Sequence, residues 1–276
     1  MEPNLLQTRL TPSLPWQIAL SALRTPARHR YGPHRSQVAD LHLPPGPGPH
    51  PVAVVLHGGY WQGQYGKVVT RPLCLDLVRR GWAAWNLEYR RLGRDRGGWP
   101  ATFEDVAAGI DYLWGLGDPR LDLDRVTAVG HSAGGQLALW AGARPRFPAG
   151  APGGEPRVML RQIVALAAVC NLEKAGRTAL ALVGGRPDEY PERWEQADPM
   201  RQVPLDIPVL LVHPRDDATV SVQVSREYAA AAEARGGHVS VIEPEAGGHR
   251  APIDPSEVAW QASALWMMQR ETLDQA

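Results

Sequence analysis

Short apolar runs rich in β-branched residues alternate with longer amphipathic segments from residue 52 almost to the end of the chain. Each run has the length of a buried strand and is bounded by turn-forming or charged residues, whereas the segments between the runs have helical periodicity. Strands that alternate with helices form right-handed βαβ units, which build a mainly parallel sheet with helices on both faces. We expect strands at residues 37–43, 52–56, 82–87, 126–129, 163–169, 209–212 and 239–242.

Helices are expected between these strands and at both ends of the chain, at residues 16–23, 67–80, 102–116, 133–143, 221–234 and after residue 254. Thr102 and Asp105 have the spacing of a capping box at the start of one of these helices. The length of 276 residues suits one large α/β domain, which we expect over residues 36–276. The connection at residues 172–208 is long enough to predict a lid or cap. Residues 1–35 are expected to form an N-terminal extension, whose short helix lies across the domain or flanks the site.

The composition argues against several classes of protein. There are 29 basic and 29 acidic residues, so nothing favours a nucleic-acid partner. Cys74 and Cys170 have apolar neighbours, which indicates buried thiols and neither a disulfide nor metal ligands. The sequence has no signal-peptide pattern at its start and no apolar run near the length of about eighteen residues that a membrane span needs. We therefore expect a cytoplasmic monomer or homodimer that uses no cofactor or metal and binds neither nucleic acid nor membrane.

The strongest motif is Gly130-His-Ser-Ala-Gly134, which lies between an expected strand and an expected helix. This is the context of a nucleophile elbow, a turn so tight that glycines are needed two residues before and two residues after the serine. Such a turn lifts the Ser132 hydroxyl above the sheet. It also directs the Ala133 backbone N–H at the same place, beside the positive end of a helix. Ser132 is therefore the candidate nucleophile.

A second motif, His57-Gly-Gly-Tyr-Trp61, follows another expected strand. Serine hydrolases need at least two backbone donors for the oxyanion of the tetrahedral intermediate. A glycine pair after a strand leaves backbone N–H groups free and unshielded. We expect Gly59 and Tyr60 to supply donors to an oxyanion hole together with Ala133.

The acid and the histidine of a catalytic triad should follow later strands, in that order. Asp216 and Asp217 both come shortly after the strand at residues 209–212 and compete for the role of the acid. His249 ends the sequence Gly247-Gly-His249, in a loop that follows the last strand, and is the candidate base. Each candidate lies beyond the carboxyl end of a strand, where open α/β sheets bind their ligands.

Aromatic residues near these motifs are candidates for contacts with a substrate. Tyr60 and Trp61 follow the oxyanion glycines, and either side chain would restrict the length of an acyl group if it turned inward. Trp99 and Trp194 lie on segments expected at the rim of the same edge of the sheet, and His131 directly precedes the nucleophile. Burial in the core is an equally good explanation for each tryptophan.

The two glycine motifs together resemble the esterase and lipase branch of the α/β-hydrolases. They are especially similar to the kynurenine formamidases (arylformamidases) and to feruloyl-esterase-like relatives. The similarity extends over residues 51–266 and includes Glu88-Tyr-Arg-Arg91, Trp99-Pro100 and Ala197-Asp-Pro-Met200. The resemblance implies an α/β-hydrolase fold and oxyanion donors at Gly59 and Tyr60.

The resemblance also places the acid at Asp217, with two departures from the family pattern. The family usually has glycine after the histidine of the acid motif and proline after its valine, where this chain has Pro214 and Ser221. The change at Pro214 leaves Asp216 as an alternative.

We interpret the chain as a serine hydrolase that cleaves small carboxylic esters through an acyl-enzyme, with a short acyl chain and an aromatic or bulky leaving group. Hydrolysis of an aryl formamide, N-formylkynurenine, is the alternative that the resemblance implies. A non-catalytic protein that uses the hydrolase fold to bind a ligand is the alternative from another class.

Overall fold

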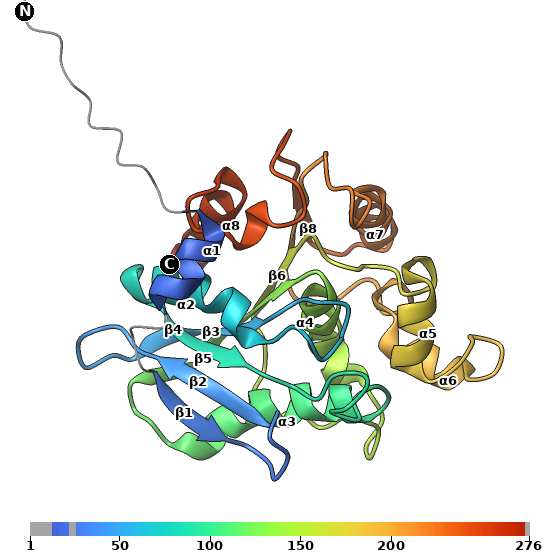
Figure 1. Cartoon of the computed structure of the whole chain (residues 1–276), viewed down its shortest axis with the longest axis horizontal. Coiled ribbons are helices and arrows are strands. Elements are labelled where there is room, and N and C mark those ends of the chain that lie inside the picture. Colours follow the sequence, from blue (N-terminus) through green and yellow to red (C-terminus); the bar gives the residue numbers. More distant parts are fainter. Residues whose placement is uncertain (1–12, 22–25, 274–276) are drawn as a thin grey trace, which may run out of the picture.

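The computed structural model describes residues 13–21 and 26–273. The strands in this part of the chain are β1 (Ala27–Arg30), β2 (Val38–His42), β3 (His50–Leu56), β4 (Ala83–Leu87), β5 (Leu121–His131), β6 (Gln162–Leu166), β7 (Val209–Val212) and β8 (Val239–Ile242). They form one sheet with the order β1-β2-β4-β3-β5-β6-β7-β8 (Figure 1). β2 runs antiparallel to both of its neighbours, and every other neighbouring pair is parallel.

Helices cover both faces of this sheet. The α-helices within the described residues are α1 (Leu14–Ser21), α2 (Arg71–Arg79), α3 (Ala101–Leu116), α4 (Ala133–Ala143), α5 (Arg177–Val183), α6 (Pro191–Ala197), α7 (Gln223–Glu233) and α8 (Val258–Leu273). Val52 and Val54 of β3 pack in one apolar cluster with α3, α4 and α7, whereas Ala53 and Val55 pack in a second cluster with α2 and α8. Successive residues of a strand point to opposite faces, so two covered faces require the continuous apolar runs seen in the sequence.

All the strands predicted from the sequence are present, and β7 and β8 have the predicted bounds. β1 was not predicted, because it falls within residues 1–35. It pairs antiparallel with β2 and so extends the sheet at its edge. The predicted helix at residues 67–80 begins with a 3₁₀ turn at Lys67–Thr70 and continues as α2. The predicted helix at residues 16–23 corresponds to α1, and its last two residues lie outside the described residues.

The capping box predicted at Thr102 is wrong. α3 begins one residue earlier, at Ala101, and no side chain caps it. Thr102 Oγ1 accepts a hydrogen bond from the Gly98 N–H and donates to the Arg90 carbonyl oxygen. The buried Asp105 carboxylate accepts hydrogen bonds from the Arg90 guanidinium. Both side chains are thus used to fix the loop that follows β4.

The carboxyl ends of the parallel strands meet at one edge of the sheet, and the loops that carry the predicted site residues begin there. Residues 172–208, expected to be a lid or cap, form α5 and α6 beside the main body of the fold (Figure 1). Leu182 of α5 and Trp194 of α6 join the apolar cluster that contains α4. This segment is therefore packed onto the domain.

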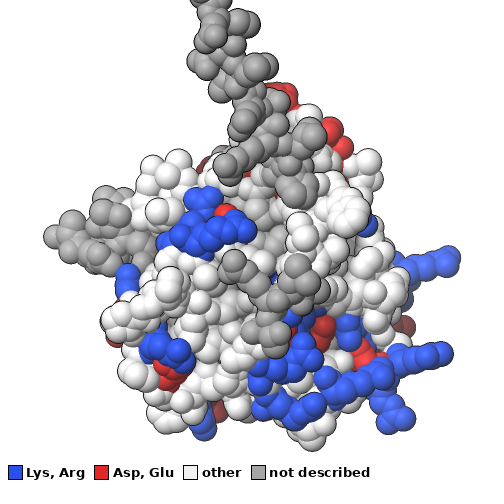
Figure 2. Space-filling view, turned by 60° about the vertical axis from the view of Figure 1, so that its left-hand side comes forward, with Lys and Arg blue, Asp and Glu red and all other residues white. Residues whose placement is uncertain are grey.

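Basic and acidic side chains lie near one another on the face that Figure 2 shows. Figure 2 shows that the basic side chains of one face gather mainly toward its lower right, with acidic side chains among them. Cys74 and Cys170 are free and buried, as predicted. None of the helices within the described residues is both long and apolar enough to cross a lipid bilayer.

Candidate active site

Ser132 lies at the junction of β5 and α4, and its backbone has φ 54° and ψ −117°. A positive φ is unfavourable for a residue with a side chain, so the surrounding turn must enforce it. A Cβ atom on Gly130 would lie 2.1 Å from the Gly134 carbonyl oxygen, and one on Gly134 would lie 2.2 Å from that of Leu56. Only glycine fits at these two positions, as the motif predicts.

The Ser132 hydroxyl faces an imidazole that is itself bound to a carboxylate. His249 Nε2 lies 2.9 Å from Ser132 Oγ, and His249 Nδ1 lies 2.7 Å from Asp217 Oδ2. Because an ionised carboxylate only accepts hydrogen bonds, Nδ1 carries the proton and Nε2 presents its lone pair to the hydroxyl. This arrangement can take the hydroxyl proton as the oxygen attacks a carbonyl group. Of the two competing aspartates, Asp217 is the one that contacts the histidine.

Asp217 accepts several hydrogen bonds in a buried position. Its Oδ1 accepts from the backbone N–H groups of Thr219 at 2.8 Å and Val220 at 3.0 Å. Its Oδ2 lies 3.1 Å from His213 Nε2, in addition to the contact with His249. Burial alone would raise the pKa of Asp217, but the hydrogen bonds from His213, His249 and the backbone outweigh burial and hold this pKa well below its ordinary value. The carboxylate is therefore ionised wherever a histidine could act as a base.

His213 supports Asp217, a role that the sequence did not suggest. Its Nε2 also lies 2.8 Å from the Val220 carbonyl oxygen, and its Nδ1 lies 2.8 Å from Ser225 Oγ. Nε2 faces two acceptors, so it carries a proton and donates to Asp217. The signals in the sequence were the position of His213 directly after a predicted strand and its place in the acid motif of the resemblance, and neither indicated a contact with Asp217.

The loop that carries His249 is fixed from two sides. The Asp216 carboxylate accepts the backbone N–H groups of Gly247 at 3.1 Å and Gly248 at 2.8 Å. On the other side, His131 Nε2 donates to the His249 carbonyl oxygen at 2.8 Å. Burial lowers the pKa of His131 to about 3, with the neighbouring His249 as the next cause, so this ring is neutral at physiological pH. Asp216 and His131 therefore position the histidine without contacting the Ser132 hydroxyl.

The glycine loop after β3 packs directly against the nucleophile. A Cβ atom on Gly58 would lie 3.0 Å from Ser132 Cβ, and the next two residues, Gly59 and Tyr60, have φ 115° and 56°. Among the described residues, no acceptor contacts the N–H of Gly59 or Tyr60. The N–H of Ala133 belongs to the first residue of α4, where no intrahelical acceptor exists. Free donors beside an activated hydroxyl are the arrangement that a developing oxyanion needs.

Glu88, directly after β4, anchors this loop from behind. Its Oε1 lies 2.7 Å from His57 Nε2, and its Oε2 accepts the Lys67 N–H at 3.0 Å. The hydroxyl of Tyr89 donates to the His57 carbonyl oxygen at 2.7 Å, and the two rings stack at 4.4 Å. Burial would raise the pKa of Glu88, but the neighbouring His57 and Arg91 lower it below its ordinary value. An ionised carboxylate therefore fixes the first residue of the oxyanion loop.

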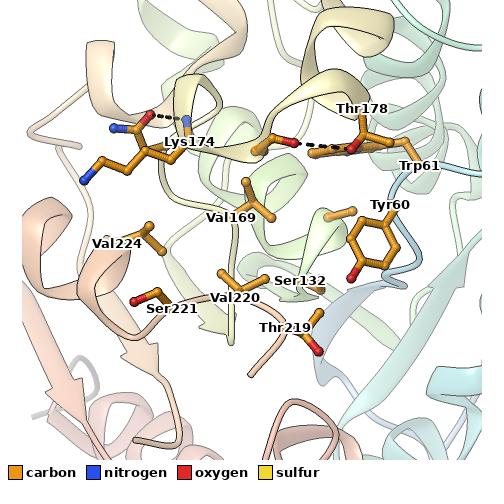
Figure 3. A pocket seen from close by; sticks show the side chains of 13 residues that line it. Tyr60, Trp61, Ser132, Val169, Lys174, Thr178, Thr219, Val220, Ser221 and Val224 are labelled. Carbon is orange, nitrogen blue, oxygen red and sulfur yellow. Dashed lines mark hydrogen bonds between the residues drawn. The ribbon is translucent and has the colours of Figure 1, made fainter. Parts of the chain in front are cut away.

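Two cavities lined by the described residues open on Ser132. One has a volume of about 250 Å³, and its walls include Trp61, Val169, Lys174, Thr178, Val220 and Val224 (Figure 3). The other has a volume of about 310 Å³, and its walls include His249, Arg250, and Leu14 and Ile18 of α1. We refer to them as the Val169 cavity and the Arg250 cavity. The short N-terminal helix flanks the site, as predicted.

Two of the predicted aromatic contacts are corrected by the structure. Trp194 of α6 is buried in the apolar cluster that contains α4, and its Nε1 donates to the Gly185 carbonyl oxygen at 3.1 Å. Trp99 packs against Phe103 with a distance of 5.2 Å between ring centroids. Neither tryptophan lines either cavity, because both rings pack against other parts of the fold.

The other predicted contacts do reach the cavities. Tyr60 lines both of them, and His131 lines the Arg250 cavity. Trp61 forms part of the Val169 cavity, although it is almost wholly buried and its Nε1 donates to Gln136 Oε1 at 3.2 Å. Its position is therefore fixed by the core.

The sheet order and the strand-turn-helix junction at Ser132 define an α/β-hydrolase fold. The structure is similar to that of a truncated carbohydrate esterase from gut microbiota, with 19% identity, a TM-score of 0.78, and 90% of this chain and 98% of that chain covered. It is also similar to butyrate-bound Est2 of Thermogutta terrifontis, with 18% identity, a TM-score of 0.72, and 95% and 94% covered. At such identities the likeness shows the fold alone.

Within this fold class, the chain belongs to the BD-FAE family, which it matches over residues 39–231. Among curated proteins it is similar to esterase LipQ of Mycobacterium tuberculosis, with 27% identity over 233 residues that cover 74% of this chain and 55% of LipQ. It is also similar to esterase LipC of the same organism, with 25% identity over 195 residues that cover 65% of this chain and 47% of LipC. The chain thus spans about half the length of these relatives.

Proposed function

We propose that this protein is a serine hydrolase that cleaves small carboxylic esters through an acyl-enzyme. The observation that carries the proposal is the continuous hydrogen-bonded series from Ser132 Oγ to His249 at 2.9 Å and from His249 to Asp217 at 2.7 Å. This series lies where two cavities meet. Membership of the BD-FAE family and the names of the esterases LipQ and LipC support the same reaction.

The acylation step follows from the positions of the protons. Ser132 Oγ attacks the ester carbonyl carbon while its proton passes to His249 Nε2, and Asp217 stabilises the imidazolium that forms. The carbonyl oxygen becomes an oxyanion, for which the N–H groups of Gly59, Tyr60 and Ala133 are the proposed donors. Collapse of this intermediate expels the alcohol oxygen, which takes the proton from His249.

Deacylation repeats the same sequence with water. His249, again neutral, accepts a proton from a water molecule as the water oxygen attacks the acyl carbon. The second tetrahedral intermediate uses the same backbone donors. Its collapse releases the carboxylic acid and returns the proton from His249 to Ser132.

The substrates expected for this site have short acyl groups, from formyl to butyryl, and an aromatic or bulky leaving group. The Val169 cavity has a volume of about 250 Å³, at the small end of ligand pockets. Its walls include Tyr60 and Trp61, and the Trp61 Nε1 donates to Gln136, so a longer acyl chain would have to displace one of these side chains. Each methylene that fits should contribute about 0.8 kcal/mol or less, and one that clashes should cost more.

A panel of 4-nitrophenyl esters of rising chain length, assayed beside N-formylkynurenine, tests the proposal. We expect kcat/KM to peak at a short ester and Ser132→Ala to lose several orders of magnitude while it keeps its fold. Retention of more than about a tenth of the rate by Ser132→Ala would exclude Ser132 as the nucleophile. Turnover of N-formylkynurenine above all esters would favour the formamidase alternative, and no turnover of any compound would favour a non-catalytic protein.

A further inference from the structure

The position of His249 assigns a different part of the substrate to each cavity. In acylation, His249 Nε2 gives its proton to the departing oxygen, so the leaving group must lie beside this imidazole. His249 lines the Arg250 cavity and is absent from the walls of the Val169 cavity. The leaving group therefore occupies the Arg250 cavity, and the acyl group occupies the Val169 cavity beside Ala133.

The Arg250 cavity is apolar except at a few positions. Its walls include Leu14, Ile18, Tyr65, Val69 and Ile253. Of the two histidines that line it, His131 is kept neutral by burial, which lowers its pKa to about 3, and His249 must be neutral to act as the base. Among the described residues that line this cavity, Arg250 is thus the only one that carries a permanent charge.

Arg250 is also free to bind a ligand. Its side chain is exposed, and among the described residues no carboxylate or other acceptor contacts the guanidinium. Its charge nevertheless reaches the site, because it is one of the causes that lower the pKa of His131. A guanidinium presents a fork of N–H donors that matches a carboxylate.

The cation of the other cavity gives a direct contrast. Lys174 lines the Val169 cavity on the side opposite Tyr60 (Figure 3). Its ammonium group binds both carboxylate oxygens of Glu227, at 2.6 Å and 2.5 Å. Its charge is therefore already matched by a protein carboxylate, whereas the charge of Arg250 is not.

We propose that Arg250 selects substrates whose leaving group carries a carboxylate on an apolar or aromatic body, while the acyl group is uncharged. This inference rests on the proposed function, since it assigns a substrate class to the same site. Arg250 is a specificity-determining residue in this scheme and takes no part in bond making. The carboxylate binds the guanidinium at the mouth of the cavity, and the apolar body packs between α1 and the loop that follows β3.

Two acetate esters of closely similar shape test the proposal. In 4-acetoxybenzoate the leaving group carries a carboxylate, and in 4-acetoxybenzamide it carries a neutral amide at the same position. We expect Arg250→Gln to lower the ratio of their kcat/KM values about five- to tenfold, as the loss of one partly exposed charged hydrogen bond would. Arg250→Lys should lower it less, because an ammonium keeps the charge and loses the fork.

Arg94→Gln is the matched control variant. Arg94 is exposed on the loop after β4 and lines neither cavity, so this change removes one positive charge without touching the site. The ratio should stay at the wild-type value in this variant. Turnover of the neutral amide ester by Arg250→Gln shows in the same assay that the variant is folded and active.

The outcomes separate this inference from the proposed function. An unchanged ratio in Arg250→Gln, with the neutral ester still hydrolysed, would overturn the role of Arg250 and leave the esterase proposal intact. Mono(4-nitrophenyl) succinate carries its carboxylate on the acyl group. If Arg250→Gln no longer hydrolysed this ester but still hydrolysed 4-nitrophenyl butyrate, the acyl group would bind in the Arg250 cavity. That result would also overturn the proposed role of Arg250. If the wild-type protein hydrolysed none of the four esters, the proposed function would be wrong, and this inference with it.

Discussion

Replacing Asp217 by asparagine should disable His249 while leaving every atom near its place. The carboxylate Oδ1 accepts the backbone N–H groups of Thr219 and Val220, whereas Oδ2 faces His249 Nδ1 at 2.7 Å and His213 Nε2 at 3.1 Å. Backbone amides cannot give up their protons, but an imidazole can move its proton to the other nitrogen. The asparagine oxygen should therefore stay at the Oδ1 position, with its amino group in place of Oδ2.

This orientation gives His249 the wrong tautomer. The amino group donates to His249 Nδ1, so the imidazole proton moves to Nε2, which can no longer accept the proton of Ser132. A triad amide of this kind costs on the order of 10⁴ in rate, or about 5.5 kcal/mol of transition-state stabilisation. We expect kcat/KM for 4-nitrophenyl acetate to fall by that factor in Asp217→Asn.

Asp216→Asn is the matched control. Asp216 is exposed, and within the described part of the chain its two oxygens accept only the N–H groups of Gly247 and Gly248. An amide there loses one of these hydrogen bonds, worth about 1 kcal/mol, and should lower kcat/KM less than tenfold. The assay compares both variants with the wild type after circular dichroism has shown equal helix content. Equal losses in the two variants, or the larger loss in Asp216→Asn, would refute the assignment of the acid to Asp217.

Three further predictions concern the charge, burial and close packing of particular groups. Between about pH 5 and 8, kcat/KM for a neutral ester should rise to a plateau through one ionisation, because His249 must be neutral while Asp217, with its lowered pKa, stays ionised; a flat profile would contradict a histidine base. Burial raises the pKa of the Asp198 carboxyl group from 3.8 to about 6. The stability that this shift contributes is fully present below pH 3.8 and is lost as the pH rises through about 6. The free energy of unfolding of Asp198→Asn, measured by chemical denaturation, should therefore rise by about 2 kcal/mol relative to that of the wild type between about pH 4.5 and pH 8. A difference between the two free energies that does not change with pH would contradict this prediction. A Cβ atom on Gly58 would lie 2.8 Å from the His131 carbonyl oxygen, whereas one on Gly115 would meet nothing within 4 Å. Gly58→Ala should therefore lower kcat about 10- to 100-fold, and the control Gly115→Ala should leave kcat unchanged. Equal kcat values in the two variants would show that the oxyanion loop tolerates displacement.

The elements that were predicted from the sequence are those whose signals are local. The elbow needs glycine at residues 130 and 134 because backbone atoms fill the space that a side chain would occupy, and this requirement is visible in the motif. The central strands are buried on both faces, so their apolar runs are unbroken. β1, in contrast, is an edge strand with the sequence Ala27-Arg-His-Arg30, mostly exposed, and a polar strand of this kind has no hydrophobic pattern to reveal it.

The features that the sequence left open or misplaced depend on partners far away in the chain. Asp216 and Asp217 are neighbours of the same residue type, and only the path of the loop that ends at His249 decides which of them contacts the imidazole. Trp194 has an ordinary amphipathic setting in the sequence, but its side chain is buried in the core and lines neither cavity. The local capping signal at Asp105 is overridden by the Arg90 guanidinium, an ion-pair partner that becomes adjacent only in the fold.

Covalent labelling by a fluorophosphonate tests the central claim most directly. The reagent forms a bond from phosphorus to the oxygen of an activated serine and releases fluoride, and it needs the base and the nucleophile together. Peptide mapping by mass spectrometry should find one adduct, on Ser132, and both Ser132→Ala and His249→Ala should remove it. An unreactive wild-type protein, or an adduct on any other residue, would contradict the account.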